Sequence, residues 1–121
     1  FSGIVVYESF INSCIEGCDM ARIKRLSDSI DSLDPFSEER DAFATTILGS
    51  AIQLTIDADG RVILPENLLQ KTQINKKALF VGKGATFEIW QPEKFETHLQ
   101  KAKENAKNKR NLLNLTPKNV T

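Results

Sequence analysis

The chain has little of what catalytic and metal-binding proteins commonly use. Its 121 residues include only two cysteines, Cys14 and Cys18, and a single histidine, His98. Two cysteines are too few for a disulfide framework, and they lack the paired spacing of a zinc site. No Ser-His-Asp arrangement, glycine-rich phosphate loop or metal-ligand cluster can be assigned. The sequence therefore indicates no enzyme, no cofactor and no small-molecule substrate.

Net charge of one sign and long apolar runs are also absent. Sixteen basic residues balance sixteen acidic ones, so bulk charge indicates neither nucleic acid nor a membrane as a partner. A DNA-binding protein of this composition has to gather positive charge locally or by oligomerising. No apolar run approaches the ~18 residues of a membrane span, and no signal peptide is recognisable. We expect a cytoplasmic protein with reduced cysteines and no membrane partner.

What the sequence does contain is a strong hairpin signal at residues 52–65. Apolar and polar residues alternate up to Ile56, an Asp-Gly turn follows, and apolar residues resume before Pro65. Alternation around Asp-Gly is typical of two paired strands joined by a tight turn. Because Arg61 directly follows Gly60, its guanidinium is expected at the hairpin tip, where it can project into a partner.

Other periodicities predict further strands and helices. Runs rich in β-branched and aromatic residues predict strands at 4–7, 13–16, 77–82 and 86–90. Apolar residues three or four apart predict helices from Asp19 to Leu33 and from Pro92 onward, and a short helix is expected at 65–70. The helix that begins at Pro92 carries Phe95, Leu99, Ala102 and Ala106 on one face.

A further helix is expected between the two hairpin-like regions. Asp34 suits its N-cap and Pro35 its first helical position. The helix is expected to end near Leu48, before Gly49, which is a plausible C-terminal stop.

Two segments repeat one plan. Residues 4–26 and 79–99 each run strand, short loop, strand and helix, and Ile4-Val5-Val6 corresponds to Leu79-Phe80-Val81. Only the second copy has a hairpin before it, so we expect about one hairpin, roughly 30 residues, to be missing at the front. The predicted organisation is a first unit with linker helices at 1–48, a second unit with its helix at 49–110, and a flexible tail at 111–121.

A resemblance to the MraZ family of bacterial transcriptional regulators is carried by Asp57-x-x-Gly60-Arg61, Leu64-Pro65, Leu79-Phe80-Val81-Gly82 and Phe87-Glu88-Ile89-Trp90. It covers about residues 3–105. The resemblance implies an α+β fold, namely a swapped-hairpin AbrB-like β-barrel made from two pseudo-repeated units with peripheral amphipathic helices. It also implies nucleoid-associated, ring-like homo-oligomers that bind double-stranded promoter DNA at direct repeats before the division and cell-wall gene cluster.

The resemblance places the family's DNA-contacting arginine on Arg61. A guanidinium can donate two parallel hydrogen bonds to O6 and N7 of guanine, or it can clamp a phosphate. Gly60 allows the turn a positive φ, and Asp57 is interpreted as a turn organiser whose carboxylate accepts backbone N–H bonds. Four lysines of the same unit are either phosphate contacts or solvated surface groups, namely Lys71, Lys76, Lys77 and Lys83. The same two alternatives hold for the basic run from Lys101 to Arg110.

Two other functions stay open. An AbrB-like antitoxin that represses its own operon would use the same kind of unit, although such proteins usually carry one unit and a toxin-binding tail. An oligomeric protein that holds another protein would not need Arg61. For the DNA-binding hypothesis, an oligomer that presents several weakly binding tips at matching spacing compensates for the lack of net positive charge.

Overall fold

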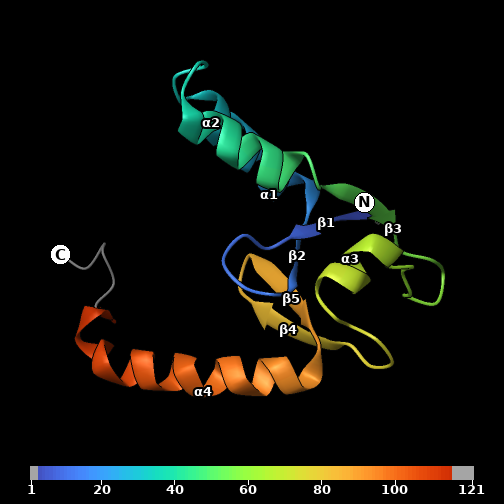
Figure 1. The fold of residues 1–121 in the computed structure, drawn as a ribbon, viewed down its shortest axis with the longest axis vertical. Helices are drawn as coiled ribbons and strands as arrows, with labels where there is room; N and C mark the ends of the chain where they lie inside the picture. Colours follow the sequence, from blue (N-terminus) through green and yellow to red (C-terminus); the bar gives the residue numbers. More distant parts are fainter. Residues whose placement is uncertain (1–2, 116–121) are drawn as a thin grey trace.

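The computed structural model describes residues 3–115, which combine one antiparallel sheet with helices that project from it (Figure 1). The sheet has the order β3-β1-β2-β5-β4. Its strands are β1 (Gly3–Glu8), β2 (Ile15–Cys18), β3 (Ile52–Thr55), β4 (Leu79–Lys83) and β5 (Thr86–Trp90). The helices are α1 (Met20–Asp31), α2 (Glu38–Phe43), α3 (Glu66–Lys71) and α4 (Pro92–Asn108). The predicted α+β class is confirmed, but within the described residues the sheet is open, with β3 and β4 at its edges.

The two units occupy the two halves of this sheet. β1 pairs with β2 and is followed by α1, and β4 pairs with β5 and is followed by α4. The halves join through the antiparallel pairing of β2 with β5. The strand predicted at residues 13–16 lies two residues later in the structure, because β2 begins at Ile15 and not at Ser13.

β3 crosses from one unit to the other. In sequence it leads into the second unit, yet it pairs with β1 of the first, with Val6 opposite Ile52 and Gly3 opposite Thr55. The predicted second arm of the hairpin is wrong, because residues 61–64 form no ladder in the sheet. The two arms meet at the turn, where the Asp57 N–H donates to the Arg61 carbonyl at 2.8 Å, and the outer edge of β3 has no neighbouring strand within the described residues.

Successive side chains of the strands point to opposite faces of the sheet and pack in two separate hydrophobic cores. Val5, Tyr7 and Cys18 pack with Ile23 and Ile30 beneath α1. Val6, the next residue along β1, points to the opposite face and packs with Ile15, Leu68, Ile74 and Ile89 beneath α3. This division follows from the two-residue period of a strand. The two cysteines are free thiols, and both are buried.

The start of α1 agrees with the sequence prediction, whereas the start of α2 does not. Asp19 caps α1, since its carboxylate accepts the Arg22 N–H at 2.8 Å. The prediction for α2 is wrong, because its N-cap is Ser37, whose hydroxyl accepts the Arg40 N–H at 3.1 Å. Asp34 instead accepts the Phe36 N–H at 3.0 Å, which closes a turn before the helix. An aspartate can satisfy the backbone two residues on as readily as it caps a helix.

The chain leaves α2 through a π-helical turn, Ala44–Leu48. The N–H of Gly49 donates to the carbonyl of Ala44 at 2.8 Å, and the helix ends where the sequence predicts. Gly49 keeps a right-handed φ of −67°, so it does not end the helix through the left-handed conformation.

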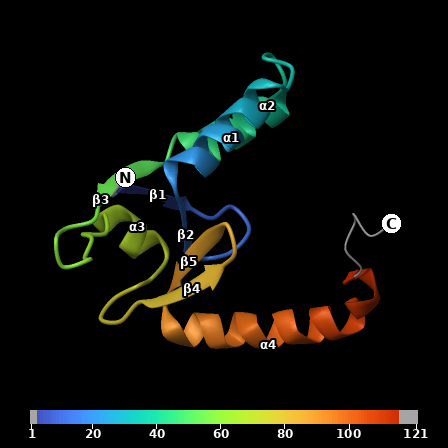
Figure 2. The same ribbon diagram turned by 180° about the vertical axis from the view of Figure 1, so that it is seen from behind.

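α4 packs on the sheet only at its beginning. The ring of Phe95 contacts Trp90 with centroids 5.7 Å apart, and His98 stacks on the same indole at 4.8 Å. Within residues 92–108 no side chain is buried, and Ala102 and Ala106 are exposed. The predicted apolar face is therefore covered over its first two turns only, and Figures 1 and 2 show the rest of α4 standing clear of the other elements.

A short 3₁₀ turn, Arg110–Leu112, follows α4. The predicted flexible tail begins in this turn, and its last residues, 116–121, lie outside the described part of the chain. No helix between residues 3 and 115 is long and apolar enough to cross a membrane.

Candidate nucleic-acid interface

The turn after β3 is organised by one carboxylate. Asp57 Oδ1 accepts the N–H groups of Asp59 at 2.9 Å and Arg61 at 2.8 Å. The backbone adds two further bonds, from Asp57 N–H to the Arg61 carbonyl at 2.8 Å and from Gly60 N–H to the Asp57 carbonyl at 3.0 Å. Gly60 has a φ of +77°, a conformation in which a glycine avoids the steric cost of a Cβ.

The same turn holds the guanidinium of Arg61 on two sides. Its Nε donates to Asp57 Oδ2 at 3.3 Å, and its Nη2 donates to Asp59 Oδ2 at 3.0 Å. The Arg61 side chain is nevertheless 73% exposed. The arginine is therefore oriented by its neighbours and open to solvent, so its remaining donors can meet an acceptor outside the protein.

An apolar groove of about 450 Å³ lies beside the turn. Gly60 and Arg61 form one part of its wall, and the rest is contributed by Ile4, Ile56, Val62, Phe80 and Phe87. The rings of Phe80 and Phe87 stack with centroids 6.3 Å apart. The turn is thus seated against the β4–β5 half of the sheet, which links its position to the second unit.

Two of the four candidate lysines form ion pairs within the chain. Lys83 Nζ lies 3.1 Å from Oε2 of Glu88, a carboxylate that is 2% exposed. Lys71 Nζ lies 4.0 Å from Glu8 Oε1 at a half-exposed position. The charge of Lys83 is therefore engaged by a buried partner, whereas that of Lys71 is held loosely.

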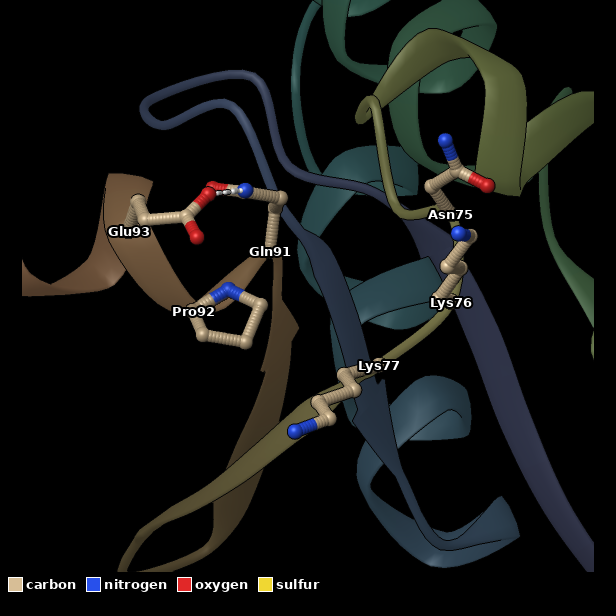
Figure 3. Close-up of a pocket in the computed structure, with 6 residues that line it drawn as sticks. All are labelled: Asn75, Lys76, Lys77, Gln91, Pro92 and Glu93. Atoms are coloured by element: carbon tan, nitrogen blue, oxygen red, sulfur yellow. Dashed lines mark hydrogen bonds between the residues drawn. The ribbon is translucent and has the colours of Figure 1, made fainter.

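The other two lysines, Lys76 and Lys77, line a polar pocket of about 510 Å³ at the start of α4 (Figure 3). Gln91 also lines this pocket, and its Oε1 caps α4 by accepting the Lys94 N–H at 2.7 Å. Its Nε2 donates to the Glu93 carboxylate, and Figure 3 shows Lys77 extending away from this pair. Both lysines are exposed.

The basic run from Lys101 to Arg110 lies apart from the turn. It occupies the far end of α4, which Figures 1 and 2 place on the opposite side of the molecule from the loop after β3. In one chain, this basic run therefore does not gather around Arg61. Across residues 3–115 no three His, Cys, Asp or Glu side chains are arranged to hold a metal ion.

The sequence reasoning missed two features of the site. Asp59 pairs with Arg61, and its position two residues before the arginine could have indicated this contact. The burial of Glu88 gave no local signal, because it depends on β2 lying beside β5.

Comparisons with known proteins agree with this arrangement. The family described as "MraZ protein, putative antitoxin-like" matches residues 47–115, which include the turn, β4, β5 and α4. A Rickettsia akari protein named "Transcriptional regulator MraZ" is 52% identical over 110 residues, or 91% of this chain and 74% of the relative. A protein of the same name from Rickettsia typhi is 50% identical over 120 residues, or 99% of this chain and 78% of the relative.

The similarity thus covers both units, beyond the half that the family match spans. The repeated strand-strand-helix plan, the Asp57–Arg61 turn and these relatives all agree. On these grounds the chain belongs to the MraZ family of transcriptional regulators.

Proposed function

We propose that this chain binds double-stranded promoter DNA through the turn that carries Arg61, and that it does so as a homo-oligomer. The observation that carries the proposal is the geometry of Arg61, whose guanidinium is oriented by Asp57 and Asp59 and is 73% exposed. Relatives named as transcriptional regulators support the same function.

The free donors of Arg61 suit a base contact. A guanidinium has five N–H donors, and two of them are used within the turn, which leaves three. Two parallel donors can meet O6 and N7 of a guanine in the major groove, a contact worth ~1–3 kcal/mol of discrimination. Preorganisation by the two aspartates lowers the conformational entropy that the side chain loses on binding.

The same aspartates limit how tightly one turn can bind. Two carboxylates surround one guanidinium, so an isolated turn carries no excess of positive charge and is repelled by phosphates at short range. Several turns on one oligomer overcome this limit, because the first contact raises the effective concentration of the next. The proposal therefore requires an operator with repeated boxes, and the direct repeats before the division and cell-wall gene cluster suit it.

We also propose that the open sheet is completed as a swapped-hairpin barrel. The crossing of β3 to β1 supports this, because exchange in the other direction would bring an equivalent strand to β4. β4 is an edge strand of the sheet within the described residues, so the backbone groups of its outer edge are available to such a strand.

The test is an electrophoretic shift assay on the DNA upstream of the gene. Arg61→Ala should lose at least tenfold in promoter affinity and keep the wild-type oligomeric mass. Arg61→Lys retains the charge but not the paired donors, so it should lose discrimination for guanine boxes and retain non-specific binding.

A salt titration separates base contacts from phosphate contacts. If each Arg61 clamps a phosphate, its removal lowers the salt slope of binding, whereas a base contact leaves the slope nearly unchanged. Equal promoter affinity of Arg61→Ala and wild type would overturn the proposal and favour a protein that holds another protein.

A further inference from the structure

We infer that copies of this chain join head to tail, with the end of α4 of one copy seated in the groove between α1 and α2 of the next. This inference rests on the homo-oligomer in the proposed function and names the two surfaces that form it. Three observations carry it, namely an apolar groove, an apolar helix end that is exposed within residues 3–115, and opposite charges around the two.

The groove lies between α1, α2 and the loop that joins β1 to β2. It has a volume of about 300 Å³, and its apolar lining consists of Phe10, Leu26, Ile30, Leu33, Phe43 and Ile47. The rings of Phe10 and Phe43 meet edge to face at 6.0 Å and stand at its mouth, 56% and 39% exposed. Apolar rings exposed in this way beside an apolar hollow mark an interaction surface.

The end of α4 offers the complementary shape. Leu112, Leu113 and Leu115 follow the helix and are 75%, 79% and 94% exposed. Residues 101–108 of α4, just before them, are also exposed. Leucines in this state expose apolar surface to water, and burying it in a groove is favourable.

Charge decides which partner the groove takes. Around the groove, residues 28–41 carry six exposed acidic side chains and one basic side chain, a net charge of −5. The acidic residues are Asp28, Asp31, Asp34, Glu38, Glu39 and Asp41. Arg40, the one basic residue, is already paired with Asp31 at 2.8 Å.

The leucine end is surrounded by the opposite charge. Residues 101–110 carry five basic side chains and one acidic side chain, a net charge of +4. The basic residues are Lys101, Lys103, Lys107, Lys109 and Arg110. The zero net charge of the chain thus conceals two strong patches of opposite sign, and each patch flanks an apolar surface. Potentials arranged in this way steer and register a partner.

The partner is a second copy, because one chain cannot bring its own two surfaces together. In Figures 1 and 2 the α1–α2 hairpin and the far end of α4 project from different ends of the sheet and stand apart. Since the two surfaces differ, the contact is heterologous and leaves one free groove and one free helix end at the extremes of any open chain. Such contacts close into rings when the rotation permits and otherwise continue as filaments.

The test exchanges the charges. One variant, Asp28→Lys/Glu38→Lys/Glu39→Lys/Asp41→Lys, changes the net charge of residues 28–41 from −5 to +3. A second, Lys103→Glu/Lys107→Glu/Lys109→Glu/Arg110→Glu, changes the net charge of residues 101–110 from +4 to −4. Each variant alone should fall from the oligomer to the single chain of 13.6 kDa in sedimentation velocity. An equal mixture of the two should recover the wild-type mass, because each groove then faces a helix end of opposite sign.

Controls make each outcome decisive. Lys24→Glu/Arg25→Glu reverses two exposed charges of α1 that do not line the groove, so it should keep the wild-type mass. Leu113→Asp should lower the mass, and no mixture that contains it should recover the wild-type mass. Recovery in the charge-exchanged mixture also shows that both variants are folded.

The inference is overturned if either charge variant keeps the wild-type mass, if the mixture stays dissociated, or if the wild-type chain is a single copy. These failures differ from a failure of DNA binding. Arg61→Ala tests the DNA contact and should leave the mass unchanged, so an oligomer that binds promoter DNA equally well with and without Arg61 contradicts only the DNA proposal.

Discussion

Glu16 and Glu88 lie directly opposite each other where β2 pairs with β5. They hold equivalent places in the two units, in Ile15-Glu16-Gly17-Cys18 and Phe87-Glu88-Ile89-Trp90, so the pairing of the units is symmetric about these two residues. Like charges directly opposite on one face are unfavourable. Each glutamate is compensated within its own unit, Glu16 by the hydroxyl of Tyr7, and Glu88 by Trp90 Nε1 at 2.9 Å and Lys83 Nζ at 3.1 Å.

This arrangement predicts a structural role for Lys83. Lys83→Met removes the cation beside the buried Glu88, and we expect a loss of about 1–3 kcal/mol in the free energy of unfolding. The lower end is favoured because the Lys83 side chain is half exposed and water can replace it. Urea unfolding followed by the fluorescence of Trp90 measures the change.

A double variant and a matched lysine test the cause. Lys83→Met/Glu88→Gln should recover most of the lost stability, since it removes the buried charge together with its partner. Lys76→Met, at an exposed lysine of the preceding loop, should stay within about 0.5 kcal/mol of wild type. Equal stability of Lys83→Met and Lys76→Met would contradict the role.

Burial of Cys14 predicts a loss of stability in alkaline solution. Burial, assisted by the carboxylate of Glu88, raises the pKa of the Cys14 thiol from 9.0 to about 12. The unfolded chain therefore releases this proton above pH 9.0, while the folded chain keeps it until about pH 12. The contribution is fully present below pH 9.0 and is lost as the pH rises through this window.

Urea midpoints at about pH 8 and about pH 10 measure that loss. In Cys14→Ala the midpoint should fall less between the two conditions than in wild type. Some dependence remains, because burial also raises the pKa values of Cys18 and Tyr7. Identical pH dependence in both proteins would refute the assignment to Cys14.

Close packing across β2 and β5 predicts that Gly17 cannot carry a side chain. Gly17 lies opposite Phe87, and a Cβ at Gly17 would be 2.2 Å from the Cζ atom of that ring. Gly17→Ala should lower the free energy of unfolding by about 1–3 kcal/mol through overpacking. Gly82→Ala in β4 is the matched control, because a Cβ there meets no atom within 4 Å. Phe87→Leu should restore part of the stability lost in Gly17→Ala, and failure to do so would exclude this clash as the cause.

The turn at Gly60 predicts a conformational cost of a different kind. A Cβ at Gly60 has open space, but the φ of +77° is unfavourable for other residues. Gly60→Ala should therefore lose about 1–2 kcal/mol in stability, while Gly60→Asn should lose less because asparagine tolerates the left-handed region. Urea unfolding ranks the three proteins, and an alanine variant as stable as the asparagine variant would contradict the explanation.

Local signals predicted the features that depend on near neighbours. The turn at Asp57–Arg61, the start of α1 next to Asp19 and the start of α4 at Pro92 all follow from residues a few positions apart. Two local predictions failed. Ser37 took the cap expected at Asp34, and residues 61–64 form no ladder with β3 beyond the bond from the Asp57 N–H to the Arg61 carbonyl.

The sequence by itself determined the family, the two units and the arginine-bearing turn, because each is written in short, contiguous patterns. Only the tertiary structure decided that β3 pairs with β1 of the first unit, that Lys83 pairs with a buried glutamate, and that an apolar groove forms between α1 and α2. The physical reason is that strand pairing and burial depend on which distant segments compete for the same surface. No pattern within one segment records the outcome of that competition.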